Sequence, residues 1–151
     1  MMHQRLIEVV QGTRPRLEAM GEAQTSLKLG RTVWSRKEIL GHLIDSAQHN
    51  HGRFVQLSLE NGTEFLGDDQ DAWVDLQRWQ ERPWLEIVAF WHAYNLHLAW
   101  VIAGLPTHSL KHEGIVFRSR KTVSLHWLIE HYVQHHEHHL QQIEDSSRRN
   151  A

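Results

Sequence analysis

The sequence of 151 residues contains no cysteine. This absence excludes disulfides, thiolate zinc sites, iron–sulfur clusters and cysteine nucleophiles. The chain also has no run of 18 or more apolar residues, which predicts that it has no membrane span. The N-terminal stretch lacks the apolar core of a signal peptide, because Glu8 and Gln11 bracket its few apolar residues. We therefore expect a cytoplasmic protein.

An excess of charge of either sign is lacking as well. Sixteen lysines and arginines face 18 aspartates and glutamates, which leaves a formal net charge of −2. Proteins dedicated to nucleic acids usually carry a basic excess, so we expect no nucleic-acid partner. The apolar share of 40% is enough to bury a core, and the length suits one domain over residues 1–151.

Histidine is the residue in clearest excess, with 14 in the chain, and tryptophan follows with seven. Imidazole binds metals and also titrates near neutral pH. The histidines are therefore the residues from which chemistry can be inferred.

The hydrophobic periodicity predicts four long helices, over about 3–21, 35–61, 83–104 and 122–144. Ser35 and Glu38 have the spacing of a capping box at the start of the second helix. Pro15 is expected to kink or split the first helix. Residues 107–120 are expected to form a loop, with one short strand over 115–117. Together these segments predict an all-α four-helix bundle with two medium-length connections.

The fourth helix carries the densest group of histidines. His131 and His135, and likewise His135 and His139, are four residues apart and so lie on one helix face. Such a pair can bind one divalent metal ion. With five histidines in nine residues, however, some such pairs are almost unavoidable, and a solvated histidine-rich face is the alternative. Periodicity places His136 nearest the centre of the apolar stripe and His139 near its edge.

A catalytic metal commonly has three protein ligands and one open position, so a third ligand must lie elsewhere. In the second helix, His42, Asp45 and His49 share one face, which is either solvated or lines a cleft between helices. The spacing alone does not choose the third ligand from the candidates His42, His49, His51, His92, His97, His108, His112 and His126.

Two segments carry a resemblance to a known family. Residues 34–46 (WSRKEILGHLIDS), with Asn50 to Phe54 after them, resemble the second helix of the DinB/YfiT-like family. The segment from His135 to Ile143 resembles its last long helix. The resemblance implies that His42 is the first metal ligand and that His135 and His139 are the second and third. Asp45 matches an acidic position near the site.

The resemblance also implies an antiparallel four-helix bundle, a homodimer and one divalent metal ion per chain, with zinc or nickel expected. The better-understood relatives look like enzymes that use low-molecular-weight thiols, as S-transferases or as thiol-dependent isomerases, and many others are labelled only as metal-dependent hydrolases. We therefore expect a small-molecule substrate and a metal that activates water or a low-molecular-weight thiol. A thiol would have to be a cosubstrate, because the chain has no cysteine. Asp45 or His49 is the candidate general base.

Two alternatives stay open from the sequence. The first is a non-catalytic, stress-related dimer in which the metal only stabilises the fold. The second is a helical interaction module with a solvated histidine cluster. The tryptophans in and beside the first connection, Trp73, Trp79 and Trp84, either line an apolar substrate pocket or pack in the core.

Overall fold

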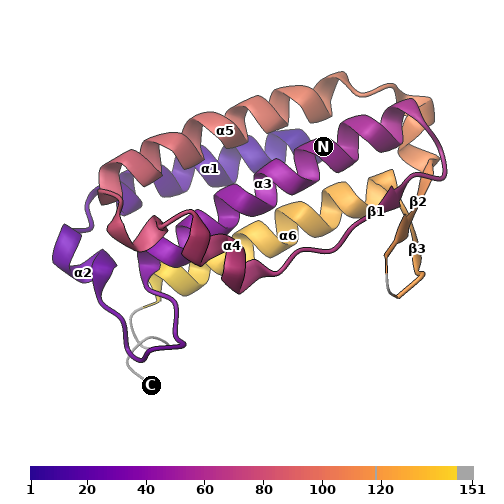
Figure 1. Ribbon diagram of the computed structural model, residues 1–151. Helices are drawn as coiled ribbons and strands as arrows, with labels where there is room; N and C mark the ends of the chain where they lie inside the picture. Colours follow the sequence, from indigo (N-terminus) through magenta and orange to yellow (C-terminus); the bar gives the residue numbers. More distant parts are fainter. Residues whose placement is uncertain (118, 146–151) are drawn as a thin grey trace.

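A computed structural model describes residues 1–117 and 119–145 of the chain (Figure 1). The last six residues of the predicted domain therefore lie outside the described part. The structure confirms the all-α class. The long helices are α1 (Met2–Glu18), α3 (Arg36–Leu59), α5 (Trp84–Gly104) and α6 (Leu125–Glu144). Shorter helical segments are α2 (Glu22–Ser26), α4 (Gln70–Leu76) and the 3₁₀ helices η1 (Trp79–Glu81) and η2 (Thr107–Lys111).

The four long helices run in two opposite directions, two helices in each. Both α1 and α3 pack against α5 and α6. Figure 1 shows α3 and α5 running one way and α1 and α6 the other. The expected antiparallel relation thus holds for α3 with α6 and for α1 with α5, whereas the neighbours α3 and α5 are parallel. The connection between these two must return along the bundle, which explains its length.

A small sheet closes one end of the bundle, where the sequence predicted only a loop and one short strand. Its strands are β1 (Glu64–Phe65), β2 (Glu113–Val116) and β3 (Thr122–Ser124). β1 pairs parallel to β2, and β2 pairs antiparallel to β3. The partners of β1 and β2 are about fifty residues apart in sequence, so no local pattern indicates this pairing.

Helix boundaries follow the predicted caps closely. The capping box at α3 is confirmed, because Glu38 N donates to Ser35 Oγ at 3.2 Å and Ser35 N donates to Glu38 Oε2 at 2.8 Å. Pro15 lies inside α1, which continues to Glu18 as one helix, so the predicted split does not occur there.

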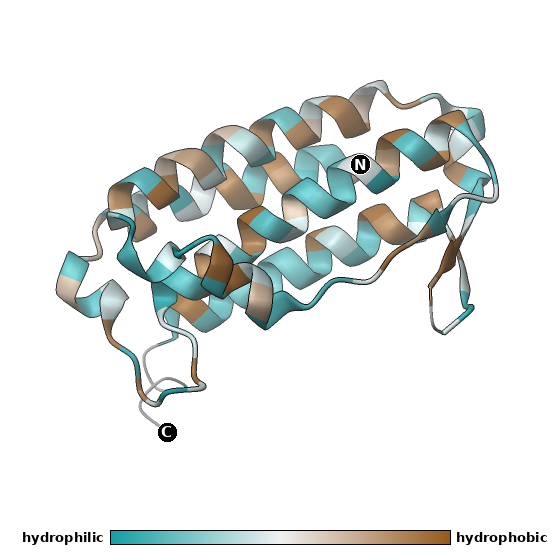
Figure 2. Cartoon of the chain, viewed as in Figure 1, coloured by the Kyte–Doolittle hydropathy of each residue, from teal (hydrophilic) through white to brown (hydrophobic). Residues whose placement is uncertain are grey.

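Helix α5 qualifies the expectation about membranes. By length and composition alone it is long and apolar enough to cross a membrane. Figure 2 shows hydrophobic segments along the whole helix. Core helices of globular bundles can be equally long and apolar. Here α5 packs against α1 and α3, although only 33% of its most apolar stretch is buried. The buried side chains include Trp84, Trp91 and Leu98.

Gly41 on α3 permits a close approach that positions Trp79. A Cβ atom at Gly41 would lie 2.2 Å from Cγ of the Trp79 indole. We expect Gly41→Ala to lower the free energy of unfolding by about 1–3 kcal/mol, because the buried indole must move. Gly52 lies on the same helix with nothing within 4 Å of such a Cβ. Gly52→Ala is therefore the matched control and should raise stability by about 0.5–1 kcal/mol. Urea unfolding of both variants measures the difference, and equal stabilities would contradict this packing.

Candidate metal centre

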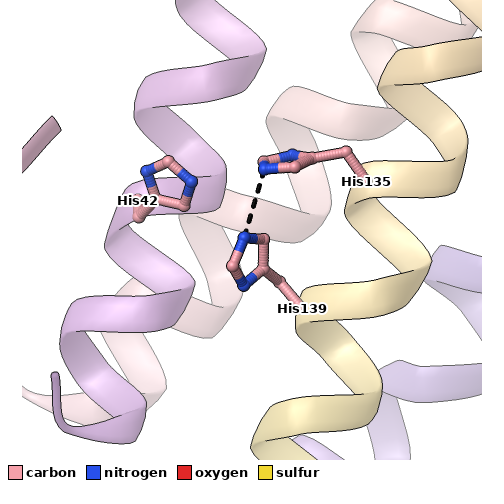
Figure 3. Close-up of side chains that lie close together, drawn as sticks. All are labelled: His42, His135 and His139. Carbon is pink, nitrogen blue, oxygen red and sulfur yellow. Dashed lines mark hydrogen bonds between the residues drawn. The ribbon is translucent and has the colours of Figure 1, made fainter. Parts of the chain in front are cut away.

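Three histidines from two helices converge inside the bundle. His42 projects from α3, and His135 and His139 project from α6 (Figure 3). One candidate ligand nitrogen from each ring lies within 4.8 Å of the other two. The Nε2 atoms of His135 and His139 are 3.1 Å apart. Ligand atoms around a tetrahedral zinc, at 2.0–2.1 Å from the metal, are about 3.3 Å apart, so this spacing suits a metal.

The His42 imidazole gives the clearest test of whether these residues fit a metal. Its side chain is buried, with 4% exposure, and its Nε2 atom has no hydrogen-bond partner. A buried nitrogen without a partner costs free energy, and a bound ion would remove that cost. The donor set of three imidazoles suits a first-row divalent metal such as zinc or nickel.

Burial keeps these imidazoles neutral. It lowers the pKa of His42 to about 4, helped by the nearby His139 and His49. It also lowers the pKa of His135 to about 4, with His139 and His42 acting in the same direction. The pKa of His139 is lowered mainly by burial. Neutral rings keep the lone pairs that a metal needs.

Two neighbours orient the histidine rings. The Nδ1 atom of His139 lies 2.9 Å from Gln142 Oε1, an arrangement in which Nδ1 carries the proton and Nε2, which faces His135 Nε2, keeps its lone pair. The indole of Trp34 packs against His42, with ring centroids 4.9 Å apart. Residues outside the triad thus fix the orientation of the His139 and His42 rings.

A cavity of about 270 Å³ adjoins the triad. His42 and His135 line it together with His49, Arg53 and Asp68. His49 Nδ1 lies 3.4 Å from Asp68 Oδ2, and the Arg53 guanidinium lies 3.4 Å from Asp68 Oδ1. Burial lowers the pKa of His49. The negative charge of Asp68 raises this pKa, and the positive charge of Arg53 lowers it further. The cavity therefore holds a largely neutral imidazole beside a carboxylate.

Asp45 lies elsewhere, although the sequence placed it with His42 and His49. Its carboxylate accepts hydrogen bonds from Gln77 Nε2 and from Trp79 Nε1. It lines a second cavity, together with residues of the α4–η1 segment and of α5. The structure thus brings together His42, His49, His135 and His139, but not Asp45.

The other histidines are not part of the triad, although His131 stacks on His135 and lines the same cavity, and the His138 ring contacts His139. His136 is fully buried and accepts a hydrogen bond from Trp91 Nε1 at 2.9 Å, which confirms its predicted place at the centre of the apolar stripe. His131 and His138 are exposed. His51 pairs with the Tyr94 hydroxyl at 2.9 Å, and His92 contacts Arg14.

Sequence reasoning missed the residues of the first connection that complete the cavity. Asp68 belongs to an acidic run that gives no local sign of a site, and its contact with His49 depends on how the connection crosses the bundle. Among the tryptophans, Trp84 is in the core, which agrees with the core-packing alternative, and its Nε1 donates a hydrogen bond to Leu17 O. Trp73 is 38% exposed and contacts the His49 ring edge-on at 4.3 Å.

Comparison with known proteins adds three findings. The family model of the DinB superfamily matches residues 5–143. YfiT from Bacillus subtilis, described as a probable metal-dependent hydrolase with an unusual four-helix bundle topology, superposes with a TM-score of 0.87 at 22% identity. The match covers 98% of this chain and 85% of YfiT.

A mycothiol-dependent maleylpyruvate isomerase superposes with a TM-score of 0.68 at 13% identity, over 93% of this chain and 60% of the isomerase. At these identities both likenesses show the fold alone. None of the curated proteins matches the chain at the sequence level.

The lowered pKa values predict an acid-sensitive metal-free protein. In the unfolded chain these histidines titrate near the ordinary pKa of 6.5, whereas His42 and His135 titrate near 4 in the fold. Between these values the unfolded state binds more protons, so stability should fall as pH falls from 6.5 to 4. We expect the imidazole C–H resonances of both residues to stay unshifted between pH 7.5 and 5.5 in NMR. Midpoints near 6.5 would show that the rings are solvated.

Proposed function

Because this chain belongs to the DinB superfamily, we propose that it is a metal-dependent enzyme that acts on a small-molecule substrate. The observation that carries the proposal is the convergence of His42, His135 and His139, with a buried and unpartnered nitrogen on His42. A solvated histidine face, the alternative from the sequence, would leave no such buried atom.

The three imidazoles would hold one divalent ion, with zinc or nickel as the candidates. When bound, such an ion lowers the pKa of a coordinated water or thiol and holds the resulting anion as a nucleophile. Because the ligands are neutral, they leave the positive charge of the ion uncompensated. A thiol nucleophile would enter as a cosubstrate, since the chain has no cysteine.

His49 is the residue to which we assign the general-base role. It lines the cavity that His42 and His135 also line, and its pKa is lowered by burial, so it is unprotonated near neutral pH. The Asp68 carboxylate near Nδ1 favours the tautomer in which that nitrogen carries the proton. The other ring nitrogen is then the one that accepts a proton from water or thiol. Asp45, the other candidate, lines a different cavity.

The remaining walls of the cavity indicate the kind of substrate. Trp127, Leu128 and Val116 contribute apolar surface, whereas Arg53 contributes a positive charge. Because Asp68 in the same cavity offsets that charge, a small substrate with an apolar part and a polar group would be complementary to these walls. The predicted homodimer and cytoplasmic location stay predictions, and sedimentation velocity of the purified protein tests the first.

Metal content tests the ligand assignment directly. Untagged protein should carry about one divalent ion per chain by mass spectrometry. His42→Ala, His135→Ala and His139→Ala should each weaken metal binding more than about 100-fold, because each removes a ligand. His126→Ala, at an exposed histidine of the same helix that does not line the cavity, is the matched control and should bind as the parent does. Equal binding by His42→Ala would refute the three-histidine site.

Turnover tests the role of His49. With water or a low-molecular-weight thiol as nucleophile, His49→Gln should lower kcat by about 10²–10⁴-fold while one metal per chain is retained. The screen uses 4-nitrophenyl acetate for hydrolysis, and glutathione with monobromobimane for thiol transfer. A metal-loaded parent that turns over neither substrate class would favour the non-catalytic dimer.

A further inference from the structure

Asp45 is a buried carboxylate that the proposed metal chemistry does not use. Its side chain is 4% exposed, and its hydrogen-bond donors are the neutral Gln77 amide and Trp79 indole. Within residues 1–117 and 119–145, no lysine, arginine or histidine forms an ion pair with it. A buried carboxylate without a cation is costly, and burial raises the pKa of Asp45 to about 6. Groups with such a cost, placed at a cavity, mark candidate binding sites.

The cavity beside Asp45 has aromatic walls. It measures about 250 Å³ and lies between α3, the α4–η1 segment and α5. Trp73, Trp79, Phe90 and Tyr94 line it. Phe90 is 42% exposed, so this aromatic surface is open to solvent. Aromatic faces attract cations, and the carboxylate supplies the opposite charge.

Arg82 shows that two of these rings already face a cation. Its guanidinium carbon lies 6.0 Å from the Trp79 ring centroid and 5.9 Å from that of Phe90. Its ion pair is with Glu86, at 3.6 Å, and not with Asp45. The Arg82 guanidinium therefore lies near the aromatic rings but does not pair with the buried Asp45 carboxylate.

We propose that this cavity binds a small primary amine, with its ammonium group donating to the Asp45 carboxylate and its alkyl part packed against the aromatic rings. A carboxylate offers about four acceptor positions, which Gln77 and Trp79 do not exhaust. A primary ammonium can donate to those left, whereas a quaternary ammonium cannot. The binding energy thus combines a charge-assisted hydrogen bond with ring contacts.

This amine site is separate from the proposed metal centre. Trp73 lines the amine cavity and contacts the His49 ring edge-on at 4.3 Å, so it stands between the two. Amine binding requires no metal, and it can be measured on metal-free protein. Failure of one proposal is therefore distinguishable from failure of the other.

The test is an NMR titration of metal-free protein, following the indole N–H resonances of Trp73 and Trp79. The probe is n-butylammonium, with n-butanol as its neutral analogue and tetramethylammonium as a cation without a donor. We expect n-butylammonium to bind most tightly, by about tenfold or more over n-butanol, because a hydrogen bond to a charged group is lost in the alcohol. Equal binding of n-butanol, or no binding of n-butylammonium, overturns the proposal.

Variants locate the charge that the amine requires. Asp45→Asn keeps the size of the side chain and should weaken n-butylammonium binding by about tenfold or more, while n-butanol binding is unchanged. Asp75→Asn, at an exposed carboxylate of α4, is the matched control and should bind as the parent does. Arg82→Gln removes a competing cation and should tighten binding. Unchanged affinity of Asp45→Asn for n-butylammonium overturns the assignment of Asp45 as the amine ligand. If that variant does not fold, the parent's preference for n-butylammonium over n-butanol still decides the question.

A last comparison identifies the source of the amine. N-acetyl-lysine methylamide presents the same ammonium on a peptide-like backbone. Weaker binding of this probe than of n-butylammonium supports a free small amine as the ligand. Tighter binding would instead identify a lysine side chain of another protein and overturn the assignment to a small amine.

Discussion

The burial of the first three turns of α3 is the constraint on which both cavities depend. Every residue from Ser35 to Asp45 is buried, including several that carry charge. The fold satisfies them individually: Glu38 pairs with Lys28 at 2.7 Å, Lys37 pairs with Glu22 at 2.7 Å, and Arg36 Nε donates to Ile143 O at 2.8 Å. Because a buried charge without a partner is costly, the bundle can enclose this segment only with these pairs in place. Once enclosed, α3 presents His42 to α6 and Asp45 to the α4–η1 segment.

The same burial has opposite consequences for the two residues. For His42 it disfavours the protonated form, so the ring stays neutral and its lone pair remains available to a metal. For Asp45 it disfavours the ionised form, so the carboxylate gains from any cation that reaches it. One helix thus carries two electrostatic sites three residues apart, and both arise from desolvation. In each case burial carries a free-energy cost, and the ligand that we propose for the site would reduce that cost.

The parallel arrangement of α3 and α5 explains how the cavities acquire their other walls. Parallel neighbours cannot be joined by a short turn, so residues 60–83 return along the bundle beside α3. This connection brings Asp68 to His49 and Trp79 to Asp45. Gly41 permits the second contact, because only a residue without Cβ allows the indole so close to the helix backbone. The topology of the bundle therefore supplies groups that the long helices lack.

Local sequence was sufficient for the long helices and for part of the candidate site. Periodicity and the Ser35–Glu38 spacing identified the long helices and the start of α3, and periodicity placed His136 in the core, because these features depend on residues within a few helical turns. His42, His135 and His139 came from the resemblance, since spacing alone left eight candidates for the third ligand. The tertiary structure alone decided the β1–β2 pairing, the direction of α5, the contact of Asp68 with His49 and the separation of Asp45 from the candidate metal site. Each of these depends on contacts between residues far apart in sequence, and helical periodicity carries no information about which neighbour a polar face will meet.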